Sequence, residues 1–211
     1  FNAGSPHFAL TMYSDDNGET WSLPQPPGNP AWQEPEVGAV PFTLSLANLG
    51  KGRLSARLSS AQARLVSSDN GETWKQVPEQ PSSKYGKIYN WDPELAATTP
   101  AGERIFATGY YLDEARNNYG VLRHSDDGGV TWSEWRAIPE WAGANEIALA
   151  QGSDGLLIAA CRVEAAEVEN DHFSSLEYSI SNDSGETWSA RQPIQGLGRM
   201  HPSMATRPSD G

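Results

Sequence analysis

The chain of 211 residues carries 15 Lys and Arg against 27 Asp and Glu, a formal net charge of −12. A negative field of this size repels phosphate backbones, so no nucleic-acid partner is expected. No apolar run approaches the roughly 20 residues that a membrane-spanning helix needs, and the single Cys161 cannot form an internal disulfide. The 20 Gly and 15 Pro, with few stretches of helical periodicity, predict many short strands and turns.

An eight-residue phrase, Ser-x-Asp-x-Gly-x-Thr-Trp, occurs four times along the chain. It recurs about every 55 residues, and a fixed period of this length is typical of a propeller or a solenoid. The shared positions are Ser14, Asp16, Gly18 and Trp21; Ser67, Asp69, Gly71 and Trp74; Ser125, Asp127, Gly129 and Trp132; and Ser181, Asp183, Gly185 and Trp188.

Each copy predicts the tight turn of a β-hairpin, with a second strand starting at the Thr-Trp pair. The Asp can accept hydrogen bonds from turn N–H groups, and the Gly can adopt the positive φ that such a turn needs. The Trp is large enough to close one small sheet against its neighbour, so all four Trp side chains should be largely buried in the same environment. An acidic loop also resembles half of a calcium site, but the bidentate Glu is missing at the required offset. A structural turn without metal is therefore favoured.

These four copies resemble the Asp-box, or BNR, repeats of sialidases and their relatives. The resemblance implies an all-β fold, a six-bladed β-propeller of four-stranded antiparallel blades. At about 55 residues a repeat, about four blades are expected, as an internal piece of a longer protein that lacks both ends. The box alone specifies architecture rather than chemistry, because binding propellers and glucan hydrolases carry it too.

Each blade should hold four strands, with the box between the third and the fourth. The blade pieces are predicted at residues 1–23, 38–78, 92–139, 144–195 and 199–211. Residues 20–23 should form the last strand of the first piece, and residues 201–206 the inner strand of the last. The proline-rich residues 24–35 and the polar residues 80–90 are expected to be loops. The other strands are predicted at 40–47, 53–58, 63–67 and 73–77; at 94–98, 104–112, 119–124 and 131–138; and at 146–150, 156–163, 174–180 and 187–194.

The most informative stretch for chemistry runs from residue 145 to residue 162. It places Glu146 at the start of one strand and Arg162 at the end of the next, with a Ser-Asp-Gly turn between them. In an antiparallel hairpin, the residues furthest from the turn come to lie side by side, so the two side chains should meet at one end of the sheet. The third blade has Glu94 but only Gly109-Tyr110-Tyr111 where an Arg would stand, so the pair is specific to the fourth blade. The alternative is a surface ion pair that contributes little.

This stretch is similar to the Glu, Asp-Gly-x-Leu and Arg pattern that sialidases carry between the third and fourth boxes. The resemblance implies that Glu146 is the catalytic base for a tyrosine nucleophile lying outside this chain. It also implies that Arg162 is one of three arginines that bind the substrate carboxylate.

Three weaker candidates for substrate binding are Arg199, His201 and Asp171. Arg199 and His201 could line the central channel, although a solvated loop and a packed histidine are the alternatives. Asp171 lies close to Arg162 in sequence and could contact a sugar, as could the aromatic and lysine side chains of residues 84–91. No cofactor is expected, because no P-loop, dinucleotide fingerprint, catalytic triad or Cys/His metal spacing occurs.

The resemblance predicts an exo-α-sialidase type of glycoside hydrolase in the full-length protein. It would release a terminal acidic sugar from a glycan or sialoglycoconjugate with retention, and activity of this piece alone is not expected. It implies a secreted or periplasmic protein. The alternative is a non-catalytic Asp-box propeller that binds glycans or a protein partner.

Overall fold

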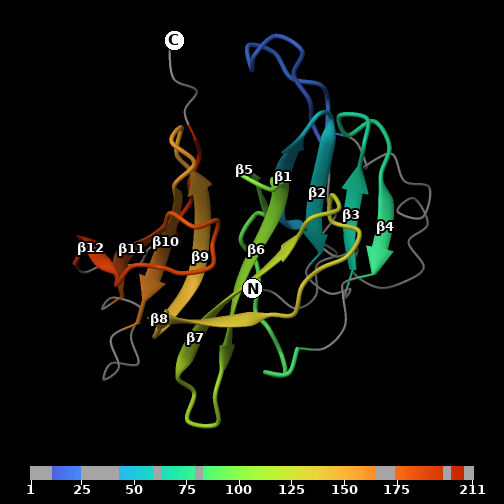
Figure 1. The fold of residues 1–211 in the computed structure, drawn as a ribbon. Coiled ribbons are helices and arrows are strands. Elements are labelled where there is room, and N and C mark those ends of the chain that lie inside the picture. Colours follow the sequence, from blue (N-terminus) through green and yellow to red (C-terminus); the bar gives the residue numbers. More distant parts are fainter. Residues whose placement is uncertain are drawn as a thin grey trace. The chain divides into compact units, whose positions relative to one another are not determined.

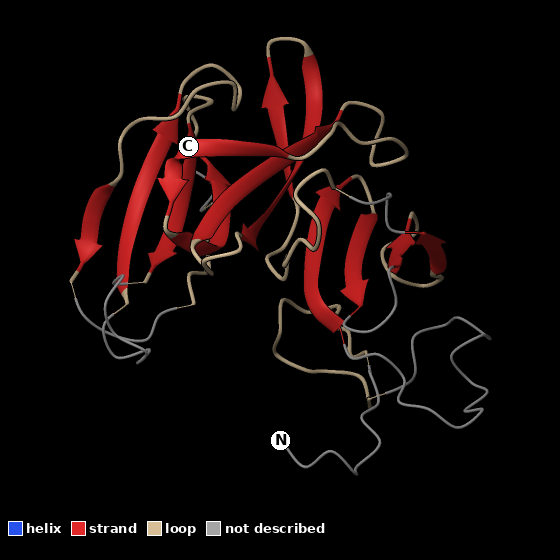
Figure 2. Cartoon of the chain, turned by 90° about the horizontal axis from the view of Figure 1, so that it is seen from below, coloured by secondary structure: helices blue, strands red, loops and turns tan. Residues whose placement is uncertain are grey.

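The computed structural model describes residues 11–24, 43–58, 63–78, 83–164, 174–196 and 201–206. Within those ranges the regular secondary structure consists of β-strands (Figures 1 and 2). No helix that could cross a membrane occurs in the part of the chain that the structure describes. The chain divides into two compact units, Phe1–Glu79 and Gln80–Gly211, which are described separately.

The first unit contains one four-stranded antiparallel sheet with strand order β1-β2-β3-β4. Its core consists of Ala56, Leu65 and Trp74, with Leu54 packed against it. Trp74 belongs to the second box, so the box contributes its largest side chain to the sheet that precedes it. The strands are β1 Thr43–Gly50, β2 Arg53–Leu58, β3 Ala63–Ser67 and β4 Lys75–Pro78.

The second unit contains two such sheets, with orders β5-β6-β7-β8 and β9-β10-β11-β12 (Figure 1). Strand β9 packs against β6 and β7 of the β5–β8 sheet, and one apolar core fills the space between the two sheets of this unit. Trp141 and Ile147 of this core are fully buried. The strands are β5 Leu95–Thr99, β6 Gly102–Leu112, β7 Asn118–Ser125, β8 Arg136–Ala142, β9 Ala144–Gln151, β10 Leu157–Val163, β11 Ser175–Ser181 and β12 Gln192–Gln195.

These sheets confirm the predicted all-β class and the four-stranded antiparallel blade with a box between its third and fourth strands. The described residues form three such blades. The prediction that the fourth strand starts at the Thr-Trp pair is wrong, because the strands start later, at Lys75, Arg136 and Gln192. The Thr N–H and hydroxyl groups and the Trp indole N–H are bonded within the box, so these residues belong to the turn.

Two shorter predicted strands are also wrong. Residues 20–23 and residues 201–206 lie outside any strand. The first box still closes a hairpin contact, since the Ser22 N–H donates to the Tyr13 carbonyl over 2.8 Å. Thr206 donates its hydroxyl to the Gln151 carbonyl over 2.8 Å, but no described strand pairs with its segment.

All four boxes share one network of hydrogen bonds, shown by the third. The Ser125 hydroxyl donates to Asp127 over 2.7 Å and accepts the Gly129 N–H over 2.8 Å. Asp127 accepts the Thr131 N–H over 2.8 Å and its hydroxyl over 2.6 Å. The Trp132 indole N–H folds back onto the Gly129 carbonyl over 3.2 Å. This network confirms that a turn N–H group donates to the box carboxylate, as predicted, and shows that the Ser and Thr hydroxyls donate to it as well.

The box glycine has positive φ in every copy, between 86° and 90°, as predicted. The residue before it also has positive φ in each copy, at Asn17, Asn70, Gly128 and Ser184. Two successive positive φ values are those of the tight hairpin turn that favours Asn and Gly. Ser184 is the least suited of these residues, because the left-handed backbone conformation is usually adopted by Gly and, less often, by Asn or Asp, whose side chains can hydrogen-bond locally.

The predicted burial of the four box tryptophans is wrong for one of them. Trp74 and Trp188 are 7% and 6% exposed, and Trp132 is partly buried, but Trp21 is 57% exposed. Trp188 lies against Trp141, with ring centroids 4.7 Å apart. Trp21 has the same indole hydrogen bond, to Gly18 over 3.2 Å, but no described sheet core lies beneath it. The box therefore sets the local turn, and burial depends on the neighbouring sheet.

We expect the box carboxylates to titrate well below the usual range. Hydrogen bonds from the box Thr hydroxyl and N–H lower the pKa of Asp16, Asp69, Asp127 and Asp183 from 3.8 to about 2. Because the folded pKa is the lower one, the stabilisation is complete above about pH 4 and is lost as the pH falls through about 2. Carboxyl-carbon NMR titration measures these values.

Thr131→Val provides the matched control for that titration. It removes the hydroxyl donor of one box, so the pKa of Asp127 should rise while those of the other three box carboxylates stay near 2. Four box carboxylates titrating together near 3.8 in the wild type would contradict the expected hydrogen-bond effect.

Candidate functional site

Glu146 lies at a β-bulge in the pairing of β9 with β10. Cys161 pairs with Ile147 and Arg162 pairs with Asn145, so the register shifts by one residue and leaves Glu146 unpaired. Its φ is 46°, which is uncommon for a residue other than glycine. A bulge redirects a side chain, and residues in such conformations concentrate at functional sites. The bulge therefore marks Glu146 independently of its residue type.

Arg162 and Glu146 form an ion pair, with Nη1 and Oε2 2.8 Å apart. Their side chains are 12% and 17% exposed, so the predicted adjacency is confirmed and the pair is not the surface contact of the alternative interpretation. The other guanidinium nitrogens of Arg162 also face protein groups. Nε donates to the Ser174 hydroxyl over 3.3 Å, and Nη2 lies 3.5 Å from Glu164. The side-chain amides of Asn118 and Asn145 hold Glu164 over 3.0 and 2.8 Å.

His201 lies between two carboxylates. Its Nδ1 is 3.5 Å from Glu146 Oε2, and its Nε2 is 3.4 Å from Asp92 Oδ1. The ring is 52% exposed, so it is not the packed histidine of the alternative interpretation. The direct polar contact with the Asp92 side chain raises the pKa of His201 above 6.5, burial opposes this rise, and the negative charges of Asp92 and Glu146 add to it. The described residues contain no group of three or more His, Cys, Asp or Glu side chains placed to hold a metal ion.

The aromatic ring of Tyr110, on β6, lies near the ion pair of Glu146 and Arg162. Burial, together with the smaller effects of the negative charges of Glu146 and Glu164, raises the pKa of Tyr110 to about 12, so Tyr110 stays a neutral phenol. The Tyr89 ring stacks on it with centroids 5.1 Å apart, and the Trp91 ring lies at 6.2 Å. Tyr110 occupies the place in the third blade that corresponds to Arg162, so the sequence comparison of the blades could have indicated it.

The loop that carries Tyr89 can approach β6 only because residue 109 is glycine. A Cβ at Gly109 would lie 2.7 Å from the Ile88 side chain and 2.8 Å from the Tyr89 carbonyl oxygen. Tyr89 and Tyr110 exchange two backbone hydrogen bonds of 2.8 Å each. This close approach holds the aromatic side chains in place.

The sequence predictions for this region therefore divide into three groups. Glu146, Arg162 and His201 come together, whereas Arg199 and Asp171 lie outside the described residues. Asp92 was missed, because its contact with His201 joins segments more than a hundred residues apart. The one feature of the sequence that could have pointed to Asp92 as a site residue is its position two residues before Glu94, in the segment that leads into β5.

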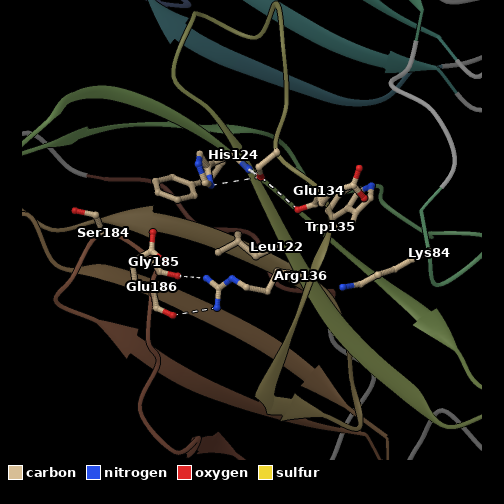
Figure 3. Close-up of a pocket in the computed structure, with 11 residues that line it drawn as sticks. Lys84, Leu122, His124, Glu134, Trp135, Arg136, Ser184, Gly185 and Glu186 are labelled. Atoms are coloured by element: carbon tan, nitrogen blue, oxygen red, sulfur yellow. Dashed lines mark hydrogen bonds between the residues drawn. The ribbon is translucent and has the colours of Figure 1, made fainter.

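A cavity of about 310 Å³ (Figure 3) lies at the end of these sheets that is opposite to Glu146 and Arg162. In the pairing of β10 with β11, Leu157 lies opposite Ser181, where the fourth box begins, whereas Val163, the residue after Arg162, lies opposite Ser175. The fourth box and Arg162 are therefore at opposite ends of these strands. The cavity is lined by the tip of that box, by Lys84, by the approach to β8 and by residues of β6 and β7, among them Leu122. Arg136 donates to the carbonyls of Gly185 and Glu186 over 2.5 and 3.0 Å, so the box tip is anchored on the neighbouring sheet (Figure 3).

The four-stranded blades and their boxes define a β-propeller protein with a sialidase-like fold. A family model described as BNR repeat-like domain matches residues 54–200, and a BNR/Asp-box repeat model matches residues 12–23. The chain belongs to the BNR repeat-like domain family. No curated protein matches the sequence.

Solved structures share this fold at low sequence identity. A protein of unknown function from Dyadobacter fermentans superposes with a TM-score of 0.63 at 20% identity, over 87% of this chain and 57% of that one. Trypanosoma rangeli sialidase in complex with 2,3-difluorosialic acid superposes with a TM-score of 0.56 at 20% identity, over 85% of this chain and 32% of that one. The chain thus spans 57% of the length of the first of these proteins and 32% of the length of the second, and the likeness shows the fold alone.

Proposed function

We propose that the full-length protein is a carbohydrate-active glycoside hydrolase of the exo-α-sialidase type, which releases a terminal acidic sugar with retention. The observation that carries the proposal is the pair of Glu146 and Arg162, placed on neighbouring strands with Glu146 at a backbone bulge. We also propose a secreted or periplasmic protein, as the resemblance to sialidases implies.

In this proposal Glu146 is the base that activates a tyrosine nucleophile contributed from outside this chain. A free phenol has a pKa of about 10, so a base must take its proton at neutral pH. A carboxylate that is largely buried and held by a guanidinium is fixed in position for that transfer. Arg162 would in addition offer its remaining N–H groups to the substrate carboxylate.

The test is a panel of fluorogenic aryl glycosides with the full-length protein. Release from α-sialosides and not from neutral glycosides is the expected result. Release from neutral glycosides alone would contradict the acidic-sugar specificity, and no release from any glycoside would contradict the hydrolase.

A non-catalytic glycan-binding propeller is the second candidate. The contacts of Arg162 favour it, because all three guanidinium nitrogens already face Glu146, Glu164 and Ser174. An arginine held in this way can be a structural residue that orients Glu146. Retention of glycans on an array without release of sugar is the result expected for this candidate.

Arg162→Lys should raise KM for carboxylate-bearing glycosides by about 10–100-fold. A lysine has one nitrogen where arginine has three, so it cannot satisfy Glu146, Glu164 and a substrate carboxylate together. The loss of a hydrogen bond between charged groups is about 1.5–3 kcal/mol, which corresponds to that factor. Steady-state kinetics on the full-length protein measures the change.

Arg104→Lys is the matched control for this substitution. Arg104 holds Asp126 with two contacts of 2.7 and 3.2 Å, at the cavity end of the sheets. Its replacement should leave KM unchanged. Equal effects of the two substitutions would show that Arg162 acts on stability and not on binding.

A further inference from the structure

A line of four ionisable side chains crosses the candidate site. Arg162 contacts Glu146, Glu146 contacts His201, and His201 contacts Asp92, over 2.8, 3.5 and 3.4 Å. They come from β10, from the bulge in β9, from the segment 201–206 and from the segment that leads into β5.

Asp92 is the buried end of the line. Its side chain is 1% exposed, and its Oδ1 atom has no aligned hydrogen bond in the structure. Removing a carboxylate from water is costly unless a cation compensates it. The His201 ring, 3.4 Å from Oδ1, is close enough for an ion pair and supplies that compensation when protonated.

Asp92 also determines which ring nitrogen of His201 can accept a proton. Carboxylates lie beside both ring nitrogens, Asp92 beside Nε2 and Glu146 beside Nδ1. When Glu146 holds a proton, Asp92 is the charged neighbour and favours the tautomer with its hydrogen on Nε2, so that Nδ1 can accept the proton of Glu146. Among the residues that the structure describes, the charged groups that face His201 are Asp92 and Glu146, and Arg162 lies beyond Glu146.

His201 is the member of the line that reaches solvent. Its side chain is 52% exposed, against 17% for Glu146 and 1% for Asp92. A proton that leaves Glu146 through His201 therefore has a path to water. A direct path from Glu146 is restricted by its burial.

We propose that His201, oriented by Asp92, is a positioning residue that relays protons between Glu146 and solvent. The nucleophile's O–H bond breaks, and its proton passes to a carboxylate oxygen of Glu146. That proton then moves from Glu146 to Nδ1 of neutral His201, which becomes an imidazolium balanced by Asp92. Release of the proton to water restores the neutral ring. The role of Glu146 in this sequence rests on the proposed function, whereas the link from Asp92 through His201 to Glu146 does not.

The link is tested by NMR titration of the histidine rings in the protein, with His201 assigned by its absence in His201→Gln. His201 should titrate above 6.5, and Asp92→Asn should lower its pKa by about 1 unit or more, as loss of an adjacent opposite charge does. Glu146→Gln should also lower it. Asp126→Asn is the matched control, because Asp126 lies 3.7 Å from His124 and should move only that ring. An unchanged His201 titration in Asp92→Asn would overturn the link.

The relay is tested by the pH dependence of turnover in the full-length protein. Since the relay needs neutral His201, turnover should fall as the pH falls through the His201 pKa. Asp92→Asn should move this acid limb to lower pH by the shift that NMR measures. His201→Gln should abolish the limb and lower kcat about 10–100-fold with little change in KM, at the low end of general acid–base effects. An acid limb unchanged in both variants would overturn the relay. Absence of activity in the wild type would instead count against the hydrolase, and the NMR titration would still decide the link.

Discussion

Glu146→Gln is expected to lower kcat by about 10²–10⁴-fold, the range found when a general base is removed. In the wild type, Arg162 donates a hydrogen bond of 2.8 Å to Glu146. The amide of the variant is nearly the same size as the carboxylate and can still accept this bond, so the site should keep its geometry. What the amide cannot do is take a proton from a nucleophile. Steady-state kinetics on the full-length protein, with circular dichroism to check folding, measures this effect.

The control for this variant is Glu186→Gln. Glu186 also pairs with an arginine, Arg104 at 3.5 Å, but it lies at the cavity end of the sheets. Turnover should be unchanged in Glu186→Gln. If Glu146→Gln retained wild-type kcat, Glu146 would not be the base, and the binding propeller would be the better account of the pair.

Trp188→Ala is expected to lower the free energy of unfolding by about 3–5 kcal/mol, the usual range for removing a buried aromatic side chain. Trp188 is 6% exposed and lies against Trp141, which is fully buried, in the core between the two sheets of the second unit. The alanine would leave a cavity beside Trp141 that the surrounding strands can fill only in part. Urea denaturation followed by circular dichroism measures the change.

Trp21→Ala is a closely matched control, because both tryptophans occupy the last position of a box. Both indoles donate to the box glycine carbonyl over 3.2 Å, so that bond is lost in either variant. Trp21 is 57% exposed, and its replacement should cost about 1 kcal/mol or less. Equal losses in the two variants would show that the box turn, rather than packing between sheets, carries the stabilisation.

The local structure of the boxes could be predicted in detail from the sequence. The Ser, Asp, Gly and Thr groups that bond one another lie within a few residues, so their contacts depend on the chain's local conformation and not on its neighbours. The contact between Glu146 and Arg162 was predictable for a similar reason, since a short hairpin brings its two ends together. Even here the bulge at Glu146 and the late start of the fourth strands were not predicted, because they depend on small shifts in strand register.

The rest of the candidate site was decided by tertiary structure. Asp92 and His201 meet although more than a hundred residues separate them, and Tyr110 reaches the neighbourhood of Glu146 from a different sheet. Four tryptophans with the same local sequence differ in exposure from 6% at Trp188 to 57% at Trp21. A short sequence window contains the donors and acceptors of a turn. It does not contain the surface of the neighbouring sheet, whose packing determines which side chains are buried and which carboxylate an imidazole meets.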